Sequence, residues 1–197
     1  PVRFITNKSS GKQGYEIAKS LSKRGFNTTL ISGPTNLKVD DTIKLIEVET
    51  ADEMFKATQE SLPSDIAIFS AAVADFKINE KKKNKIKKEE SLSINLEKNV
   101  DILNYVSNHN SMRPKLVIGF AAETNDLEIN AISKLKSKNC DWIIANDISK
   151  KNSGFNSDFN EVTIYFKNSV NKKEKLTLKK KSEISEEIVD RIVAQIN

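Results

Sequence analysis

The sequence is poor in the residue types that many enzymes use for catalysis or metal binding. Its 197 residues include one cysteine, Cys140, and one histidine, His109. A single cysteine excludes an internal disulfide framework, and this pair alone excludes a zinc site of the usual Cys/His spacings. A Cys–His or Ser–His–Asp nucleophile would have to use His109. We expect Cys140 to be buried at the start of a strand, His109 to lie in a surface loop, and the compartment to be the reducing cytoplasm.

Long apolar runs are also missing. No stretch approaches the roughly 20 apolar residues that span a bilayer, and no signal segment opens the chain. The sequence begins with Pro1 rather than methionine, which suggests a fragment or a processed chain. At 22.1 kDa, without repeats or a composition break, residues 1–197 are predicted to form a single domain that has no membrane contact.

Basic residues are concentrated in two segments. Lysine and arginine total 32 against 27 acidic residues, a net charge of +5. Residues 77–90 carry a local +4 and residues 172–181 a local +5, so the remainder of the chain carries −4. Only four basic residues are arginines, and few aromatic residues stand among the lysines, which argues against a nucleic-acid partner. The second segment is expected to be a solvated strand edge.

Short β-rich runs alternate with amphipathic stretches along the chain. This alternation predicts a doubly wound, mostly parallel α/β sheet of the Rossmann-like type with a small C-terminal antiparallel hairpin. Strands are expected at 2–6, 28–32, 44–49, 65–72, 91–96, 115–120, 141–146, 161–166 and 175–178. Helices are expected at 12–24, 51–62, 100–108, 127–138 and 183–196, and residues 147–160 are expected to form a loop.

Ligands of such sheets bind at the carboxyl ends of the strands, so candidate functional residues should lie just after each expected strand. The first expected strand is followed by a turn, residues 7–14, that contains Ser10 and Gly11 and leads into a helix. Backbone N–H groups at such a helix start suit a phosphate, although Ser10 serving only as a helix cap is an equal alternative. An acidic residue some 20 positions later, which would bind a ribose, is missing, so NAD binding is weakly supported.

A second candidate region follows the strand expected at 65–72. Small residues run from Ser70 to Ala74 and would let a flat ligand lie against the backbone, and Asp75 could bind a sugar hydroxyl or a metal, or cap a helix. The lysine-rich stretch at 76–90 then suits a mobile lid over phosphates. Further on, Gly119–Thr124 repeats the pattern of small residues after a strand, and Lys134 and Lys138 share one helix face.

These segments together resemble a known family, the phosphopantothenoylcysteine synthetase (CoaB-type) domain of the bacterial bifunctional phosphopantothenoylcysteine decarboxylase/phosphopantothenate–cysteine ligase. One departure is Val100, where the family usually has proline. The resemblance covers nearly the whole chain and rests on eight motifs in order: VRFITNKSSGKQG, LISGPT, SAAVADF, KIKK, NVDIL, VIGFAAET, KLKSKNCDWIIAND and NEVTIY.

The resemblance implies a CTP-dependent ligase with the substrates CTP, 4′-phosphopantothenate and L-cysteine. The carboxylate of phosphopantothenate would attack the α-phosphate of CTP to give an acyl-cytidylate and pyrophosphate, and the cysteine amine would then displace CMP. It also implies Mg²⁺ bound on the CTP phosphates, without side-chain metal ligands, and a homodimer contacting through the C-terminal hairpin. FMN would belong only to a decarboxylase half preceding Pro1.

The resemblance also assigns residues. Asn7 would polarise the acyl carbonyl as cysteine attacks, Arg3 would serve the same half-reaction through the substrate phosphate, and Lys85 in the lid would neutralise the triphosphate. Ala71 and Ala72 would line the intermediate pocket, to which our own reasoning adds Ser10 and Gly11. The remaining nucleotide-binding positions are Ser70, Asp75, Asp101, Ile102, Leu103, Phe120, Lys134 and Lys138.

Two other functions fit parts of the sequence. An NAD(P)- or nucleotide-binding Rossmann-like module without ligase activity would share the fold and the glycine-containing turn. A nucleic-acid-binding protein would account for the positive charge, but it requires a continuous basic face and a steep salt dependence of binding.

Overall fold

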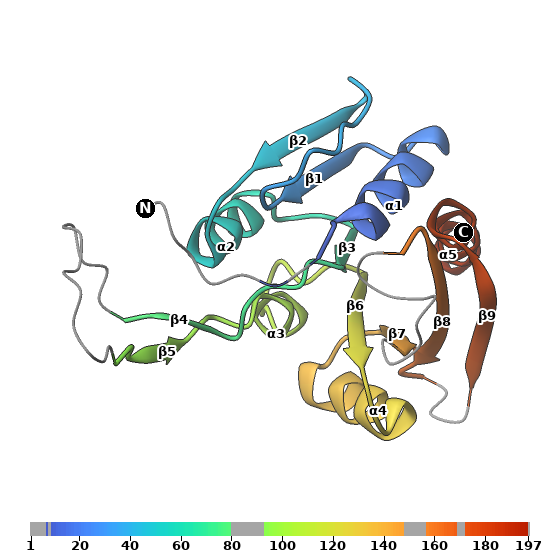
Figure 1. The fold of residues 1–197 in the computed structure, drawn as a ribbon. Coiled ribbons are helices and arrows are strands. Elements are labelled where there is room, and N and C mark those ends of the chain that lie inside the picture. Colours follow the sequence, from blue (N-terminus) through green and yellow to red (C-terminus); the bar gives the residue numbers. More distant parts are fainter. Residues whose placement is uncertain (1–6, 8, 80–92, 148–156, 169–171, 197) are drawn as a thin grey trace.

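The computed structural model describes residues 7, 9–79, 93–147, 157–168 and 172–196. Within them the chain forms five helices and nine strands (Figure 1). The helices are α1 (Lys12–Lys23), α2 (Ala51–Glu60), α3 (Ile102–Ser107), α4 (Leu127–Lys138) and α5 (Lys181–Ile196). The strands are β1 (Thr28–Ser32), β2 (Ile43–Glu47), β3 (Ile66–Phe69), β4 (Phe76–Ile78), β5 (Leu96–Lys98), β6 (Leu116–Glu123), β7 (Trp142–Asp147), β8 (Phe159–Phe166) and β9 (Lys173–Lys180).

The strands form three groups. The largest is a five-stranded sheet in the order β3-β6-β7-β8-β9, with β3, β6 and β7 parallel and β8 and β9 antiparallel. Strands β1 and β2 form a parallel pair, and β4 and β5 an antiparallel pair. The mixed α/β class is therefore confirmed, and the C-terminal hairpin is an integral edge of the main sheet rather than an appendage to it.

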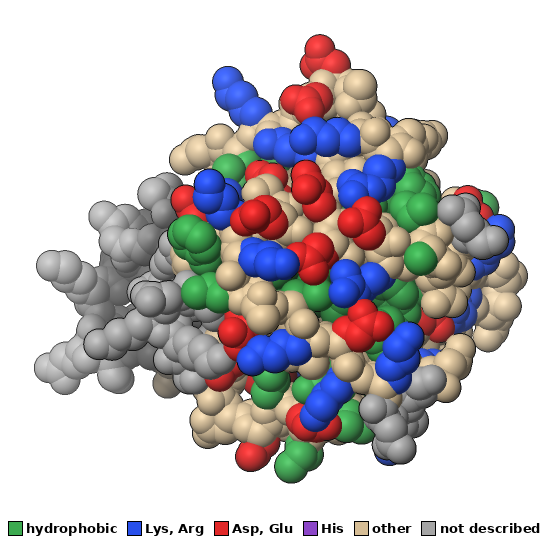
Figure 2. Space-filling model, turned by 90° about the vertical axis from the view of Figure 1, so that its right-hand side faces the viewer, with side chains coloured by type: hydrophobic (Ala, Val, Ile, Leu, Met, Phe, Trp, Pro, Cys, Tyr) green, Lys and Arg blue, Asp and Glu red, His purple; other side chains and the backbone are tan. Residues whose placement is uncertain are grey.

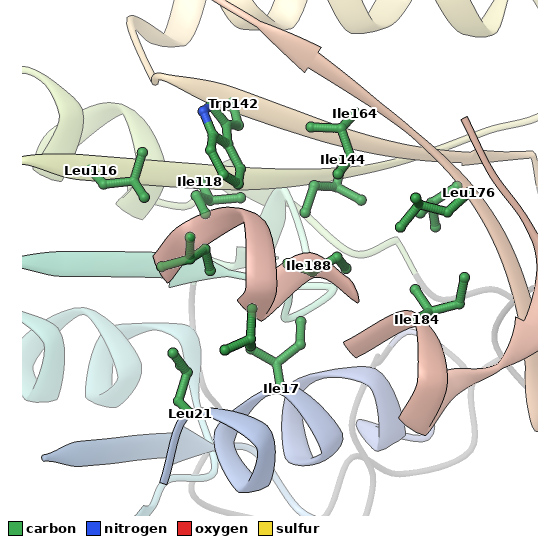
Figure 3. Close-up of a cluster of buried hydrophobic side chains, with 13 residues drawn as sticks. Ile17, Leu21, Leu116, Ile118, Trp142, Ile144, Ile164, Leu176, Ile184 and Ile188 are labelled. Carbon is green, nitrogen blue, oxygen red and sulfur yellow. The ribbon is translucent and has the colours of Figure 1, made fainter. Parts of the chain in front are cut away.

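Helices cover both faces of the main sheet. On one face, α1 and α5 pack against it through Ile17, Leu21, Ile184 and Ile188, as Figure 3 shows. On the other face α4 packs through Ala131 and Leu135. The sheet contributes fully buried side chains to each cluster because alternate residues of β6 and β7 point to opposite faces. This sandwich fixes the carboxyl ends of β3, β6 and β7 relative to the helix starts.

Most predicted elements are present within a few residues of their expected bounds. The strand expected at 2–6 lies outside the described residues. The strand expected at 91–96 was placed too early: residues 93–95 are not in a strand, and β5 begins at Leu96, where pairing with β4 begins. Strand β4 was not predicted, since residues 76–78 were assigned to the lid. The short β4–β5 ribbon lies on the opposite side of the molecule from α5 and β9 (Figure 1).

The burial of Cys140, Trp142 and His109 can be compared with what the sequence predicted for them. Cys140 is fully buried two residues before β7, close to the predicted strand start, and burial raises the pKa of its thiol to about 11. Trp142 is buried in the core. His109 follows α3 and is partly buried, and its Nδ1 accepts hydrogen bonds from the backbone N–H groups of Ser111 and Met112. His109 therefore organises its own turn.

Candidate functional site

The candidate site lies where the turn before α1 meets the carboxyl end of β3. The Asn7 side-chain amide donates a 2.8 Å hydrogen bond to the carbonyl of Ala72. A Cβ placed on Gly14 would lie 2.7 Å from the Ser70 hydroxyl oxygen, so the first turn of α1 lies directly against Ser70. The structure thus brings together two segments that are 65 residues apart, both of which were predicted to carry chemistry.

The turn itself places Gly11 at the N-cap of α1. Gly11 has φ +72°, in the left-handed region that favours glycine, and it carries no side chain that could cap the helix. The backbone N–H groups of Gly11 and Lys12 donate long hydrogen bonds, 3.4 Å each, to the hydroxyls of Ser9 and Ser10. Ser10 is exposed and precedes the cap position. This geometry suits an anion at the helix start.

A buried polar network joins the start of α1 to β8 and α5. The Gln13 amide donates to the Ser185 hydroxyl at 2.8 Å and to the Lys181 carbonyl at 3.3 Å, and it accepts from the Asn160 amide at 3.1 Å. Asn160 and Ser185 are buried. Nearby, Lys12 forms a 2.6 Å ion pair with Asp158 and lowers the pKa of that carboxyl. The turn at 7–14 is therefore attached to β8 and α5.

Hydrogen bonds also join the residues after β3 to the segment that precedes α3. The Asn99 side chain donates to the carbonyl of Ala74 at 2.7 Å, and its backbone N–H donates to the carbonyl of Asp75 at 2.8 Å. The Asn99 side-chain oxygen is buried and has no hydrogen-bond partner among the described residues. Asp75 is exposed beside it.

The side chains of the predicted stretch from Asp101 to Leu103 mainly cap α3 and pack in the core. Asp101 caps α3, with its carboxylate accepting from the Asn104 N–H at 2.9 Å, and it also accepts from the Lys138 ammonium. Ile102 is buried, and Leu103 packs against Gly119 of β6, where a Cβ would lie 2.7 Å from a Leu103 methyl carbon. A ligand would meet the backbone of these residues.

Helix α4 presents its two predicted lysines to acidic partners. Lys134 forms a 2.7 Å ion pair with Glu123, the last residue of β6, and Lys138 pairs with Asp101. Phe120 lies elsewhere: its side chain packs with the cluster under α1 and α5, on the sheet face opposite to α4. The structure therefore places Asp101, Lys134 and Lys138 near one another, and it separates the Phe120 ring from them.

Several predicted positions lie outside the described residues. These are Arg3, Lys85 and most of the expected lid, residues 80–90. The part of the lid that is described begins with β4, in which Lys77 forms an ion pair with Asp52 of α2 at 2.9 Å. The hydrogen bond that Lys77 donates to the Asp52 carboxylate raises the pKa of Lys77, because it stabilises the charged form. The base of the expected lid is thus attached to α2 and β5.

Sequence reasoning missed four residues that shape this site. Gly14, Gln13, Asn99 and Glu123 are all within motifs that drew attention, but none was assigned a role. A glycine inside a predicted helix is a signal for close packing, so Gly14 could have been found from the sequence. The partners of Gln13, Asn99 and Glu123 could not, because they depend on how distant segments meet.

The described residues contain no group of three or more His, Cys, Asp or Glu side chains arranged to hold a metal ion. Their helices include none long and apolar enough to cross a membrane.

The chain matches a known family model over nearly its full length. Residues 1–196 match the family described as DNA/pantothenate metabolism flavoprotein C-terminal domain. The coenzyme A biosynthesis bifunctional protein CoaBC of Haemophilus influenzae is 43% identical over 195 residues, which cover 98% of this chain and 48% of that protein. CoaBC of Bacillus subtilis is 40% identical over 197 residues, with the same two coverages. The chain thus spans about half the length of these curated relatives.

Solved structures agree with this match. The crystal structure of the C-terminal domain of CoaBC superposes with a TM-score of 0.81 at 36% identity, covering 100% of this chain and 88% of that chain. A Cab2 mutant in complex with phosphopantothenate-cysteine superposes with a TM-score of 0.72 at 17% identity, covering 98% of this chain and 80% of that chain. The second similarity concerns the fold alone.

Proposed function

Since the chain belongs to the DNA/pantothenate metabolism flavoprotein C-terminal domain family, we propose that it is a CTP-dependent phosphopantothenate–cysteine ligase of coenzyme A biosynthesis. The observation that carries the proposal is the junction of Asn7 with Ala72, because it gathers the predicted intermediate-binding residues at one strand end. Residues 1–197 would act as a single ligase domain with a lid at about 76–90.

The reaction proceeds in two steps. A carboxylate oxygen of 4′-phosphopantothenate attacks the α-phosphorus of CTP, forming a P–O bond as the bond to pyrophosphate breaks. The amine of L-cysteine then attacks the acyl carbonyl, loses a proton, and releases CMP as the amide forms. Both steps bring multiply charged anions to the site. Positioned donors that stabilise developing charge are therefore the main catalytic requirement.

The first group of residues acts on the acyl intermediate. Asn7 is held by Ala72 at the carboxyl end of β3, where its amide would polarise the acyl carbonyl during attack by cysteine. Ala71 and Ala72 leave room for the intermediate, and the backbone at Ser10 and Gly11 would bind a phosphate. Arg3 would contribute to the same half-reaction.

The second group binds the nucleotide. Lys85 of the lid, with Lys134 and Lys138 of α4, would offset the charge of the triphosphate. Ser70 and the backbone at 101–103 would contact the remainder of CTP, with Asp75 at its sugar. The Phe120 ring packs on the opposite face of the sheet and is left out of this group. Magnesium would arrive bound to the phosphate oxygens of CTP, consistent with its preference for substrate ligands. The exposed Asp75 carboxylate, after β3, is an oxygen ligand of the kind that Mg²⁺ prefers.

The proposal includes a homodimer. Exposed large apolar side chains gather on and beside the β4–β5 ribbon: Phe76, Ile94, Leu96 and Val100, each about half exposed. The C-terminal hairpin exposes two such side chains, Phe159 and Leu178, and four of the eight residues of its outer strand β9 are lysines. The β4–β5 ribbon is therefore a better candidate for the contact than the C-terminal hairpin.

A direct assay tests the activity. We would incubate the protein with phosphopantothenate and cysteine, adding CTP or ATP in separate reactions, and measure products by mass. Amide product with CTP is expected, and its absence with both nucleotides would overturn the proposal. NADPH serves as a control ligand: protection against thermal unfolding by NADPH but not by CTP would instead favour a dinucleotide-binding module.

Two variants separate the half-reactions. Lys85→Gln is expected to lose acyl-cytidylate formation, whereas Asn7→Asp is expected to form the acyl-cytidylate and stall before the amide. Loss of one positioned donor typically costs about 100- to 1,000-fold in rate. Normal turnover by the Asn7 variant would remove that residue from the site. Lys56→Gln, on the exposed face of α2, is a matched control for the lysine change.

A further inference from the structure

We propose that Glu123 is a positioning residue that holds the Lys134 ammonium at the nucleotide subsite. Glu123 is the last residue of β6, at the carboxyl edge of the parallel strands, where ligands of such sheets bind. Its carboxylate accepts from Lys134 at 2.7 Å. The inference rests on the proposed function, because it takes Lys134 as a ligand of the nucleotide.

Both oxygens of the Glu123 carboxylate are engaged by α4. One accepts from Lys134, and the other accepts from the Asn130 amide at 3.2 Å. Asn130 and Lys134 are four residues apart and share a helix face. The Asn130 amide also donates to the carbonyl of Asn125 at 3.0 Å, which ties the turn before α4 to the same group. The Glu123 carboxylate thus fixes the position of the first turn of α4 and of the Lys134 ammonium.

Burial explains why this pair would act differently from an ordinary surface ion pair. The Glu123 side chain is 16% exposed, whereas that of Lys134 is 43% exposed. Breaking a largely buried ion pair leaves an uncompensated charge and is costly, so Lys134 is held at this position. An ammonium has three donors, so one bond to Glu123 leaves capacity for phosphate oxygens on the exposed side. The Lys134 side chain has then already lost its rotamer entropy before the nucleotide binds, so binding does not have to order it.

The chain supplies a matched control on the same helix. Glu128 of α4 also forms a 2.7 Å ion pair with a lysine, Lys173. That pair is about half exposed on both sides, and its lysine belongs to β9 rather than to the predicted site. Glu123→Gln and Glu128→Gln each remove one carboxylate charge from a 2.7 Å ion pair that involves α4, and only the first should affect the nucleotide.

The experiment measures CTP affinity by calorimetry for Glu123→Gln, Glu128→Gln, Lys134→Met and the double variant Glu123→Gln/Lys134→Met. We expect Glu123→Gln to weaken CTP binding about 10-fold, Glu128→Gln to bind like wild type, and the double variant to bind like Lys134→Met. That non-additivity is the signature of a residue that acts through another. Wild-type affinity in Glu123→Gln, or additive losses in the double variant, would overturn the inference.

Two further variants separate positioning from a merely structural role. Asn130→Ala removes the second carboxylate contact but leaves the ion pair, so its CTP affinity should stay within about 3-fold of wild type; a loss equal to that of Glu123→Gln would count against positioning. If Glu123→Gln does not fold, Glu123→Asp replaces it in the same cycle. Wild-type protein that binds CTP but forms no amide would defeat the proposed function alone, whereas wild-type protein that does not bind CTP would defeat both.

Discussion

At the residue scale, Gly119 shows how the absence of a side chain lets α3 pack closely against β6. A Cβ there would lie 2.7 Å from a methyl carbon of Leu103 and 2.9 Å from Cδ1 of Ile143. Gly119→Ala should therefore displace Leu103 and destabilise the fold by about 1–3 kcal/mol, the usual cost of overpacking. Urea unfolding would measure the loss.

The control for this prediction is Gly33→Ala. A Cβ at Gly33 meets nothing within 4 Å, so the free energy of unfolding should change little. Equal losses for the two variants would show that the contact with Leu103 and Ile143 is not the cause. Since α3 starts at the predicted nucleotide-binding residues 101–103, we also expect Gly119→Ala, but not Gly33→Ala, to weaken CTP binding.

Cys140 gives a second prediction at this scale. Burial raises the pKa of its thiol from the ordinary 9.0 to about 11. At pH 8 the reactive thiolate is then roughly 1 in 1,000 molecules, against roughly 1 in 10 for the unfolded chain. Native protein should react with a thiol reagent at least about 100-fold more slowly than protein unfolded in urea.

The same pKa difference has a consequence for stability. Between pH 9 and 11 the folded protein retains the thiol proton that the unfolded chain loses, so stability falls as the pH rises through that range. As the chain has a single cysteine, the rate of thiol labelling reports on Cys140 alone. Fast reaction of the native protein at pH 8 would contradict the burial.

At the scale of the elements, α2 begins at a local sequence signal, Thr50 followed three residues later by Glu53. Thr50 accepts from the Glu53 N–H at 3.2 Å, and the Glu53 carboxylate accepts from the Thr50 N–H at 3.2 Å, a complete capping box. Thr50→Ala should cost about 1 kcal/mol in urea unfolding. Thr58→Ala, the same change in the middle of α2, should cost less, because that hydroxyl bonds back to the carbonyl of Met54. A larger loss at Thr58 would contradict this account.

Elements with local signals were predicted well, and those without them were not. Helix α4 has the predicted bounds, and β6 and β7 begin within one residue of theirs, because their apolar periodicity and flanking turns are local properties of the sequence. Strand β4 was missed, since Phe76–Ile78 becomes a strand only through pairing with β5 twenty residues later. The site follows the same rule: the strand ends were predicted, but the ion-pair partners of Lys134 and Lys138 were not.

At the scale of the whole molecule, the distribution of charge decides between kinds of anionic partner. Figure 2 shows basic and acidic side chains interspersed over the face that carries α5 and β9, rather than a basic patch. Many of these lysines have acidic partners from three different elements: Lys173 with Glu128, Lys175 with Glu161, and Lys179 with Glu187. The lysine-rich β9 edge is thus largely neutralised, and it lacks the continuous positive potential that a nucleic acid requires.

A triple variant of β9 tests this assignment. Lys173→Gln, Lys175→Gln and Lys179→Gln together remove three charges whose ion pairs are 2.7, 3.3 and 2.5 Å long. Because partly exposed pairs contribute about 0–1 kcal/mol each, urea unfolding should show a modest loss that shrinks at high salt. The affinity for CTP should be unchanged, because these lysines do not belong to the predicted site. A severalfold change in CTP affinity would instead mean that the β9 edge acts on the nucleotide through the long-range field of the molecule, and the two basic segments would then have to be treated as one functional surface.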